Sequence, residues 1–389
     1  MSKWEKVRLG DVCDIERGGS PRPIDKYITN DPFGINWIKI GDTSPDSMYI
    51  TKTEQKITPE GAKKSKYVKS GDFLLTNSMS FGRPYILKID GCIHDGWLVL
   101  RDKKEYFHKE YLYYALSSKQ IYEKFKNLAV GGVVNNLNTN LVKKVEVPLP
   151  PIEKQKQIAK TLDTVAELLA LRKQQLAELD HLIKSVFYDM FGDPVVNEKG
   201  WPMRKIGDFS IVKIGPFGSL LNSNDYIEGG VPLINPSHIV NSEIIPDMKL
   251  TVSAEKYDEL KSYALRQGDI VVGRRGEIGR CAVVNKEGLI CGTGSMFIRI
   301  QKYFLPLVLQ QIISSESIRA KLEHLSVGVT MKNLNAGTIS NLKVPMIPLH
   351  LQNQFADIVA KIKEQKKLVK KAIDETQTLF DSLMNQYFD

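Results

Sequence analysis

Residues 147–190 read VPLPPIEKQKQIAKTLDTVAELLALRKQQLAELDHLIKSVFYDM, and this stretch decides the fold. Its proline-rich start is typical of a chain about to enter a helix. The residues that follow repeat apolar side chains in alternating steps of four and three, the 3.5-residue period of a coiled-coil seam. A run of about 40 residues predicts a helix roughly 60 Å long at about 1.5 Å per residue. The seam positions are Ile158, Leu162, Val165, Leu169, Arg172, Leu176, Leu179, Ile183, Val186 and Met190.

The same stretch occurs again 197 residues later, where residues 344–387 read VPMIPLHLQNQFADIVAKIKEQKKLVKKAIDETQTLFDSLMNQY. Its seam positions have the same spacing, and they are Phe355, Val359, Ile362, Lys366, Val369, Ile373, Thr376, Phe380, Leu383 and Tyr387. Each seam has a charged residue near its middle. Such a residue can fix the register of a helix pair, or its head group can simply reach solvent.

The 197-residue offset also aligns the rest of the chain, which indicates a tandem duplication. The matching pairs include Leu9-Gly10-Asp11 with Ile206-Gly207-Asp208, Gly71-Asp72 with Gly268-Asp269, Gly82-Arg83 with Gly279-Arg280, Asn136-Leu137-Asn138 with Asn333-Leu334-Asn335, and Gln155 with Gln352. Between these anchors the two halves differ almost completely. We therefore expect two copies of one fold that present different surfaces.

The predicted domains are residues 1–151, 152–191, 192–348 and 349–389. The first and third, here called the first head and the second head, contain short β-rich runs broken by Gly-Asp turns. Each head also has one helical piece, near residues 109–128 and 305–325, so the class is α+β. The other two segments are long helices. Because the second helix starts at the second head, it must run back to pair with the first. This predicts two similar heads separated by an intramolecular antiparallel coiled coil with a pseudo-twofold axis.

Composition indicates a polyanionic partner. The 389 residues hold 54 Lys and Arg against 45 Asp and Glu, a net charge of +9. The two long helices carry nearly balanced charge, so most of the surplus belongs to the heads, which suits nucleic acid. No apolar run is long enough to span a membrane and the start is not a signal segment, so we expect a cytoplasmic chain. The four cysteines form no CxxC pair, which fits a reduced compartment.

Catalytic and cofactor motifs are missing from the sequence. There is no GxxxxGK[ST] phosphate loop, and no helix pattern follows the glycine-rich residues 273–279. Residues 235–238, Asn-Pro-Ser-His, only partly resemble the Asn-Pro-Pro-aromatic motif of amino-methyltransferases. The six histidines show no metal-binding spacing. We therefore predict a chain that is not an enzyme and that holds neither cofactor nor metal.

Two alternatives stay open. Metal-dependent nucleases often place Pro-Asp before Glu-x-Lys, and that order occurs twice here, with Pro45-Asp46 before Glu54-Gln55-Lys56 and Pro246-Asp247 before Glu259-Leu260-Lys261. Glu-x-Lys is common by chance in a chain with 25% charged residues, and the two copies differ in spacing. The other alternative is a scaffold whose heads bind proteins.

Three pairs of loops have residues suited to DNA. They are 17–22 with 213–219, 77–83 with 274–280, and 131–138 with 328–335. Arg reads guanine and Asn reads adenine bidentately, while Lys, Ser and Thr suit phosphates. The candidate DNA-binding residues are Arg17, Ser20, Arg22, Asn77, Ser78, Ser80, Arg83, Asn135, Asn136, Asn138, Lys213, Ser219, Arg274, Arg275, Arg280, Thr330, Lys332, Asn333 and Asn335.

The order of parts resembles the specificity (S) subunit of type I restriction-modification systems. The resemblance rests on the two divergent heads, each with L-G-D or I-G-D near its start and a seam helix after a VPLPP-like segment. It implies two target recognition domains that each read half of a split, asymmetric double-stranded DNA site. It also implies helices that space the heads and dock two methyltransferase (M) subunits, with restriction/motor (R) subunits as further partners. S-adenosylmethionine, ATP and Mg would then act in those partners. The resemblance gives no matched motif for the loop residues, which rest on their chemistry alone.

Overall fold

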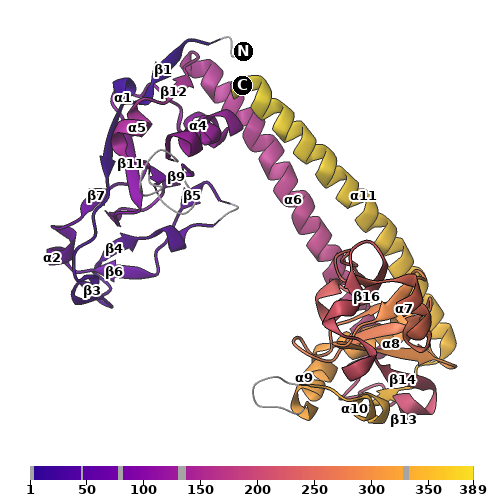
Figure 1. The fold of residues 1–389 in the computed structure, drawn as a ribbon. Coiled ribbons are helices and arrows are strands. Elements are labelled where there is room, and N and C mark those ends of the chain that lie inside the picture. Colours follow the sequence, from indigo (N-terminus) through magenta and orange to yellow (C-terminus); the bar gives the residue numbers. More distant parts are fainter. Residues whose placement is uncertain (1–3, 45–46, 78–81, 130–136, 327–332, 389) are drawn as a thin grey trace. The chain divides into compact units, whose positions relative to one another are not determined.

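The structure is a computed structural model that describes residues 4–44, 47–77, 82–129, 137–326 and 333–388. By its internal contacts the chain divides into two compact units. The first unit contains Met1–Lys173 and Lys371–Asp389, and the second contains Gln174–Lys370. Each unit therefore comprises one head and parts of both long helices, α6 (Ile152–Phe191) and α11 (Leu349–Phe388) (Figure 1).

The first head contains two five-stranded sheets and a two-stranded ribbon. The first sheet has the strand order β2 (Cys13–Arg17), β11 (Trp97–Asp102), β8 (Phe73–Thr76), β9 (Pro84–Leu87), β5 (Tyr49–Ile50). The second has the order β3 (Ile28–Thr29), β6 (Gln55–Ile57), β4 (Ile35–Ile38), β10 (Gly91–Ile93), β7 (Lys66–Val68). The ribbon pairs β1 (Lys6–Arg8) with β12 (Glu146–Pro148). The α-helices are α1 (Leu9–Val12), α2 (Pro59–Ala62), α3 (Lys109–Ser117), α4 (Lys119–Ala129) and α5 (Thr139–Lys143).

The second head repeats this topology with two differences: its first sheet has no equivalent of the edge strand β5, and it has one additional two-stranded ribbon. Its first sheet has the order β14 (Ser210–Ile214), β24 (Ser295–Ile300), β21 (Ile270–Gly273), β22 (Cys281–Val283). Its second has the order β15 (Tyr226–Ile227), β19 (Thr251–Val252), β16 (Val231–Ile234), β23 (Leu289–Cys291), β20 (Ala264–Leu265). The ribbons are β13 (Met203–Lys205) with β25 (Lys343–Pro345) and β17 (Ile239–Val240) with β18 (Glu243–Ile244). The α-helices are α7 (Ala254–Glu259), α8 (Pro306–Ser314), α9 (Glu316–Leu325) and α10 (Ala336–Asn341). The predicted duplication and α+β class are confirmed.

The central strands are apolar throughout because both of their faces are covered. Along β8, Phe73 and Leu75 belong to the core that includes the helices, while Leu74 between them belongs to the core beneath the second sheet. In the second head, Ile270 and Val272 face one core and the intervening residue of β21 the other. This alternation is the two-residue period of a strand, applied to two hydrophobic layers.

The predicted single helix in each head is wrong in one respect, since each is two helices. Helix α3 ends before Ser118 and α8 ends before Ser315, and both serines are extended, with ψ of 147° and 149°. Each serine hydroxyl donates to the carbonyl three residues earlier, at 2.8 and 2.7 Å. A serine that bonds back to its own backbone competes with the helix, and the chain changes direction there.

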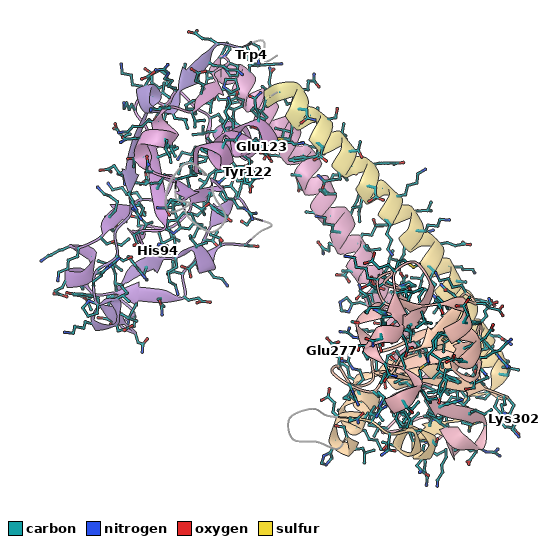
Figure 2. The ribbon with its side chains drawn as sticks, in the orientation of Figure 1. Trp4, His94, Tyr122, Glu123, Glu277 and Lys302 are labelled. Atoms are coloured by element: carbon teal, nitrogen blue, oxygen red, sulfur yellow. The ribbon has the colours of Figure 1, made fainter. Side chains whose placement is uncertain are left out.

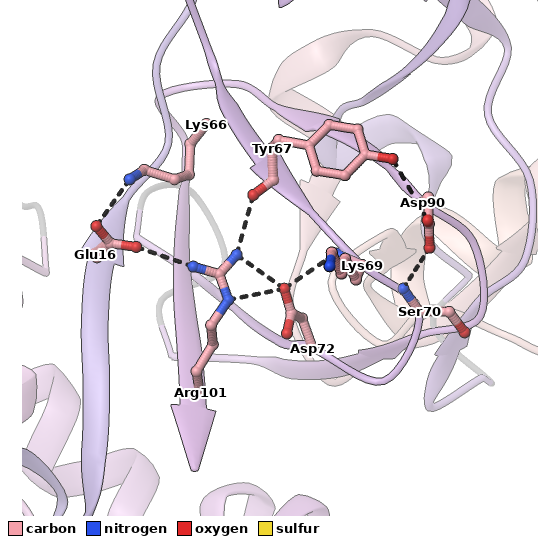
Figure 3. A network of polar contacts seen from close by, with 8 residues as sticks. All are labelled: Glu16, Lys66, Tyr67, Lys69, Ser70, Asp72, Asp90 and Arg101. Carbon is pink, nitrogen blue, oxygen red and sulfur yellow. Dashed lines mark hydrogen bonds and ion pairs between the residues drawn. The ribbon is translucent and has the colours of Figure 1, made fainter. Parts of the chain in front are cut away.

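The repeated Gly-Asp turn joins the two sheets of each head. Asp72 accepts hydrogen bonds from the backbone of Lys69 at 3.0 Å and from Arg101 Nε and Nη2 at 3.0 and 2.9 Å (Figure 3). Arg101 on β11 also donates to the carbonyl of Tyr67 on β7, in the other sheet. In the second head Asp269 and Arg299 make the same contacts. The motif is therefore structural in both heads.

Helices α6 and α11 pack against each other in antiparallel order, as predicted. In the first unit Ile158, near the start of α6, shares a core with Phe388 at the end of α11. In the second unit Phe187 and Phe191, at the end of α6, meet Phe355 near the start of α11, with ring centroids 5.9 and 5.4 Å apart. Every predicted seam position is buried or half-buried. The leucines between them are 40–60% exposed, namely Leu168, Leu171, Leu182, Leu368 and Leu379.

Both charged seam residues bond across the helix pair. Arg172 donates to the carbonyl of Ala372 and to the hydroxyl of Thr376, which is only 3% exposed. Lys366 pairs with Asp180. A misaligned register would leave these groups without partners, so the two contacts favour one register.

Among the described residues, no helix has the length and apolar character needed to cross a bilayer.

Candidate nucleic-acid interface

The described ends of the three predicted loops of the first head lie close together, next to the turn that precedes β11. Gly18, after β2, donates its backbone N–H to Trp97 O at 2.9 Å. Asn77, after β8, donates to Gly96 O at 3.0 Å and accepts from Leu137 N at 3.0 Å. Gly18 and Asn77, about 60 residues apart in sequence, thus both hydrogen-bond to backbone at the start of β11, and Leu137 bonds to Asn77 in turn.

The second head makes the same three contacts. Gly215 donates to Ser295 O at 3.0 Å, and Arg274 donates to Gly294 O at 3.0 Å. Leu334 donates to Arg274 O at 2.9 Å. The framework of the loops is therefore shared, although the side chains on it differ.

Glycine is required where the first loop passes this turn. A Cβ on Gly18 would lie 2.1 Å from His94 O, and one on Gly215 would lie 2.0 Å from Gly292 O. Both contacts are with backbone, which has no room to move, so no other residue fits there. This turn has the same length in both heads. The second head has its one additional residue earlier, between Val283 and Leu289, which strand pairing makes equivalent to Ile86 and Gly91.

In the first head, four predicted residues gather around Asp95. Arg17 Nε donates to Asp95 O at 3.1 Å, and Ser20 Oγ donates to Asp95 Oδ1 at 2.8 Å. Arg22 Nη2 lies 3.6 Å from Asp95 Oδ2, and Asn77 Nδ2 donates to Asp95 O at 2.8 Å. Burial by itself would raise the pKa of Asp95, but the Ser20 hydrogen bond and the charges of His94 and Arg17 outweigh it and lower the pKa.

The other described candidates of the first head have local partners as well. Arg83 lies over the ring of Tyr85, with its guanidinium carbon 5.4 Å from the ring centroid. Asn138 caps the N-terminus of α5 by accepting from Leu141 N at 3.0 Å. The Asn138 side chain therefore stabilises the start of a helix. Its residue type alone could not show whether it caps a helix or reads adenine.

In the second head, Lys213 and Arg274 are both engaged. Lys213 Nζ lies 4.0 Å from the centroid of the Tyr263 ring and donates to the carbonyl of Ser262 at 3.0 Å. Arg274 Nε donates to Asn333 Oδ1 at 3.1 Å. Burial, with the charge of Arg275 nearby, lowers the pKa of Arg274.

The remaining described candidates of the second head differ in exposure. Arg275 and Ser219 are exposed. Arg280 Nε donates to Glu277 Oε2 at 3.0 Å and its Nη1 donates to Pro236 O at 3.3 Å. Asn335 caps α10 by accepting from Thr338 N at 2.8 Å, as Asn138 caps α5.

Six candidates lie outside the described residues. They are Ser78, Ser80, Asn135, Asn136, Thr330 and Lys332.

Equivalent positions in the two heads have different charges. Glu16 and Lys66 of the first head form an ion pair at 2.7 Å. The hydrogen bond from Lys66 lowers the pKa of Glu16. At the same two places the second head has Lys213 over the Tyr263 ring. The contact is retained while its chemistry changes. Each head has one positive group there, and the second head has no negative group, so its net charge at this place is higher by one.

Sequence reasoning missed two acidic residues that contact the candidate arginines. The backbone carbonyl of Asp95 accepts from Arg17 and its carboxylate lies 3.6 Å from Arg22, while Glu277 pairs with Arg280. Figure 2 labels Glu277 and also His94, the neighbour of Asp95. Asp95 lies in a polar turn immediately before the apolar run Trp97–Leu100, and such a turn is the only signal that the sequence offers.

The nuclease alternative gains no support from the described residues. Asp46 lies outside them. Asp247 accepts from the backbone of Lys249 within its own turn, and Glu259 pairs with Lys256. Among the residues with a described position, no three His, Cys, Asp or Glu side chains form a group that could hold a metal ion.

Residues 1–181 and 198–377 each match the family described as type I restriction modification DNA specificity domain. The chain is therefore a protein with two such domains in tandem. The chain belongs to the DNA specificity (S) subunits of type I restriction-modification systems. This confirms the resemblance drawn from the repeat.

Curated relatives match over nearly the whole chain. The type I restriction enzyme MjaVIII specificity subunit of Methanocaldococcus jannaschii is 24% identical, over 98% of this chain and 91% of the relative. The EcoBI specificity subunit of Escherichia coli is 23% identical, over 99% of this chain and 85% of the relative.

Two solved structures share the fold. A chain from a study of complex assembly and conformational transition of the type I R-M system has a TM-score of 0.66 at 18% identity, covering 99% of this chain and 97% of that one. The type I S subunit of M. genitalium has a TM-score of 0.52 at 16% identity, covering 100% and 96%.

Proposed function

We propose that each head reads one half of a split, asymmetric site on double-stranded DNA. The observation that carries this proposal is the pair of loop clusters, which have the same backbone contacts but different side chains. Arg274 of the second head, a residue type that suits guanine, stands where the first head has Asn77, which is 1% exposed and donates to Asp95 O. Exposed Phe217 follows Gly215 by two residues, where the first head has Ser20 after Gly18. Because the two heads present different side chains from loops with the same backbone arrangement, we expect them to recognise two different half-sites.

The long helices space the heads and provide the docking surface for partner subunits. Their seam accounts for one apolar stripe, whereas Leu171 and Leu368 project into solvent at 55% and 60% exposure. Two helices leave these side chains uncovered, and helices of two methyltransferase subunits would bury them. Relatives are named as subunits of restriction enzymes, which supports association with R subunits too.

The chemistry belongs to those partners. We assign adenine N6-methylation with S-adenosylmethionine to the M subunits, and ATP-driven, Mg-dependent translocation and cleavage to the R subunits. This chain determines which DNA sequence the complex recognises and is not itself an enzyme. We place its work in the cytoplasm, where its thiols stay reduced.

A head exchange tests the proposal. Residues 1–151 are replaced by the first head of another family member, and N6-methyladenine is mapped genome-wide with and without the chimera. One half of the methylated site should change and the other half should stay. The reciprocal exchange of residues 192–348 is the matched control and should change the opposite half. A change in both halves from one exchange would refute the two-reader proposal.

A further inference from the structure

Positive charge is concentrated in one stretch of α11. Residues 361–371 read KIKEQKKLVKK, with six lysines and one glutamate, so this stretch carries +5 in a chain whose total is +9. The equivalent stretch of α6, residues 164–174, reads TVAELLALRKQ and carries +1. The other acids of α11 lie outside the basic stretch and nearly balance it over the whole helix, namely Asp357, Asp374, Glu375 and Asp381.

Three of the lysines form a line along one face of the helix. Lys363, Lys367 and Lys370 follow one another in steps of four and three residues, and their side chains are exposed. In the described part of the chain none of the three lies within 4.0 Å of a carboxylate oxygen, whereas Lys366 pairs with Asp180 and Lys371 with Glu375. The three form what is here called the basic stripe.

Helix stability does not explain the basic stripe. Like charges four residues apart, as in Lys363 with Lys367, destabilise a helix. The helix dipole favours lysine only in the last turn, and α11 continues to Phe388, far beyond the stripe. An external anion on this face would relieve the repulsion.

The basic stripe lies on a different face of α11 from its exposed leucine. Leu368 is 60% exposed and belongs to the surface that we assign to partner subunits. At about 100° per residue, Lys363 and Lys370 lie about 140° and 160° around the helix from Leu368. A partner helix that covers Leu368 therefore leaves the stripe open to another ligand.

The stripe begins where α11 leaves the core of the second head. Phe355, Val359 and Ile362 belong to that core, and Lys363 is the next residue. All three lysines belong to the same compact unit as the second head. At about 1.5 Å per residue the stripe is about 10 Å long, which corresponds to about three phosphates of one DNA strand at about 3.4 Å each along the axis.

We infer that the basic stripe binds phosphates of the unread DNA that adjoins the second half-site. The inference rests on the proposed function and adds a contact outside the recognition loops. A lysine ammonium binds phosphate as a point charge, and phosphate carries no sequence information. The stripe therefore adds affinity without changing the sequence that is read.

The test is the salt dependence of DNA binding by the full chain, assembled with its methyltransferase partners. The logarithm of the binding constant falls against the logarithm of salt concentration with a slope of about 0.9 for each phosphate contact. Lys363→Gln should lower this slope by about 0.9, and glutamine at all three stripe positions, the triple variant, should lower it by about 2.7. Between roughly 50 and 200 mM salt, the affinity of the unaltered chain should then fall by a factor about 40 times larger than that of the triple variant. The methylated sequence should stay the same.

Two control variants separate the stripe from charge in general and from folding. Exposed Lys361 is on the same helix, about 160° around it from Lys363, and Lys361→Gln should leave the slope unchanged. Arginine at all three stripe positions keeps the charge and should keep the slope of the unaltered chain.

Neutral methylphosphonate linkages locate the contact on the DNA. Placed in the spacer beside the second half-site, they should lower the slope of the unaltered chain and leave that of the triple variant unchanged. Placed beside the first half-site, they should affect both chains equally.

An unchanged slope in the triple variant, or an equal fall in Lys361→Gln, would overturn the inference. Loss of the methyltransferase subunits from the triple variant, with an unchanged slope, would instead make the stripe a docking surface for an acidic protein. Each of these outcomes, with the methylated sequence retained, leaves the proposed function intact. Failure of the unaltered chain to set any methylated site would refute the proposed function itself.

Discussion

Replacing Gln155 with methionine should destabilise the first unit by about 2–5 kcal/mol and leave the second unit unaffected. Gln155 is 1% exposed at the start of α6. Its Oε1 accepts from His108 N at 2.8 Å, and its Nε2 donates to the carbonyls of Tyr106 and Pro150, both at 2.9 Å. One side chain therefore joins the long helix to the segment that leads into α3.

The magnitude follows from these three bonds. Methionine has nearly the same volume, so no cavity opens and the cost is polar. One buried N–H and two carbonyls lose their partner, and each lost bond costs about 0.5–1.5 kcal/mol, with more for a fully buried group. Gln155→Glu should be worse, because its carboxylate would face the carbonyl oxygens of Tyr106 and Pro150.

Hydrogen exchange read by mass spectrometry measures the effect where it arises. The amide of His108 should exchange faster in Gln155→Met, by the factor that corresponds to the lost free energy. Gln352 makes the same three bonds in the second unit, to Leu305 N and the carbonyls of Tyr303 and Ile347, each at 2.8 Å. Gln352→Met should therefore reproduce the effect there.

Exposed Gln157, two residues further along α6, provides the matched control. If Gln155→Met cost no more than Gln157→Met, or if Gln155→Glu were tolerated as well as glutamine, the hydrogen-bond argument would be wrong. Faster exchange in the second unit would equally contradict it.

Three further results are expected. Leu176→Asp places a charge in the helix seam, where Leu176 is half-buried. Full burial of a Leu contributes about 1.5–3 kcal/mol and this side chain contributes part of it, so co-purification with M subunits should fall while the methylated sequence stays the same. Normal assembly with an altered target would contradict this. Burial lowers the pKa of His94 below its ordinary 6.5, and its Nδ1 accepts from Gly96 N at 2.6 Å. Between pH 6.5 and the lower pKa of folded His94, this histidine is protonated in the unfolded chain but neutral in the folded one. The first unit should therefore lose stability as the pH falls through this range. Thermal melts should show a smaller loss in His94→Asn. Burial also raises the pKa of all four cysteines, to about 12 for Cys13 and Cys281. A thiol reagent at about pH 8 should therefore label the native chain hardly at all and the denatured chain fully. Fast labelling of the native chain would contradict this expectation.

Much of the fold could be predicted because its signals are local. The heptad spacing and the prolines before each helix act over a few residues, and the offset of 197 residues aligns anchors of the duplication along both halves. Chain connectivity then requires the second helix to run back along the first. The breaks at Ser118 and Ser315 could not be predicted in the same way, because a serine inside an apolar pattern is compatible with a continuous helix.

The functional loops were predictable only as regions. Glycine, arginine and asparagine in equivalent places indicated the loops that we propose to read DNA, but residue type did not separate Asn138, which caps a helix, from a candidate base reader. Gln155 was visible as a repeated anchor, and its three partners were not.

The duplication, the helix pairing and the two loop sets can be derived from the order of residues along the chain. The tertiary structure was needed to show that Arg17 hydrogen-bonds to the backbone of Asp95, 78 residues away. It was also needed to show that Arg101 on one sheet donates to a carbonyl of the other. Helix periods and turns depend on neighbours in sequence. Which residues meet at the loops depends on strand pairing, because pairing brings the ends of β2, β8 and β10 close together in the head.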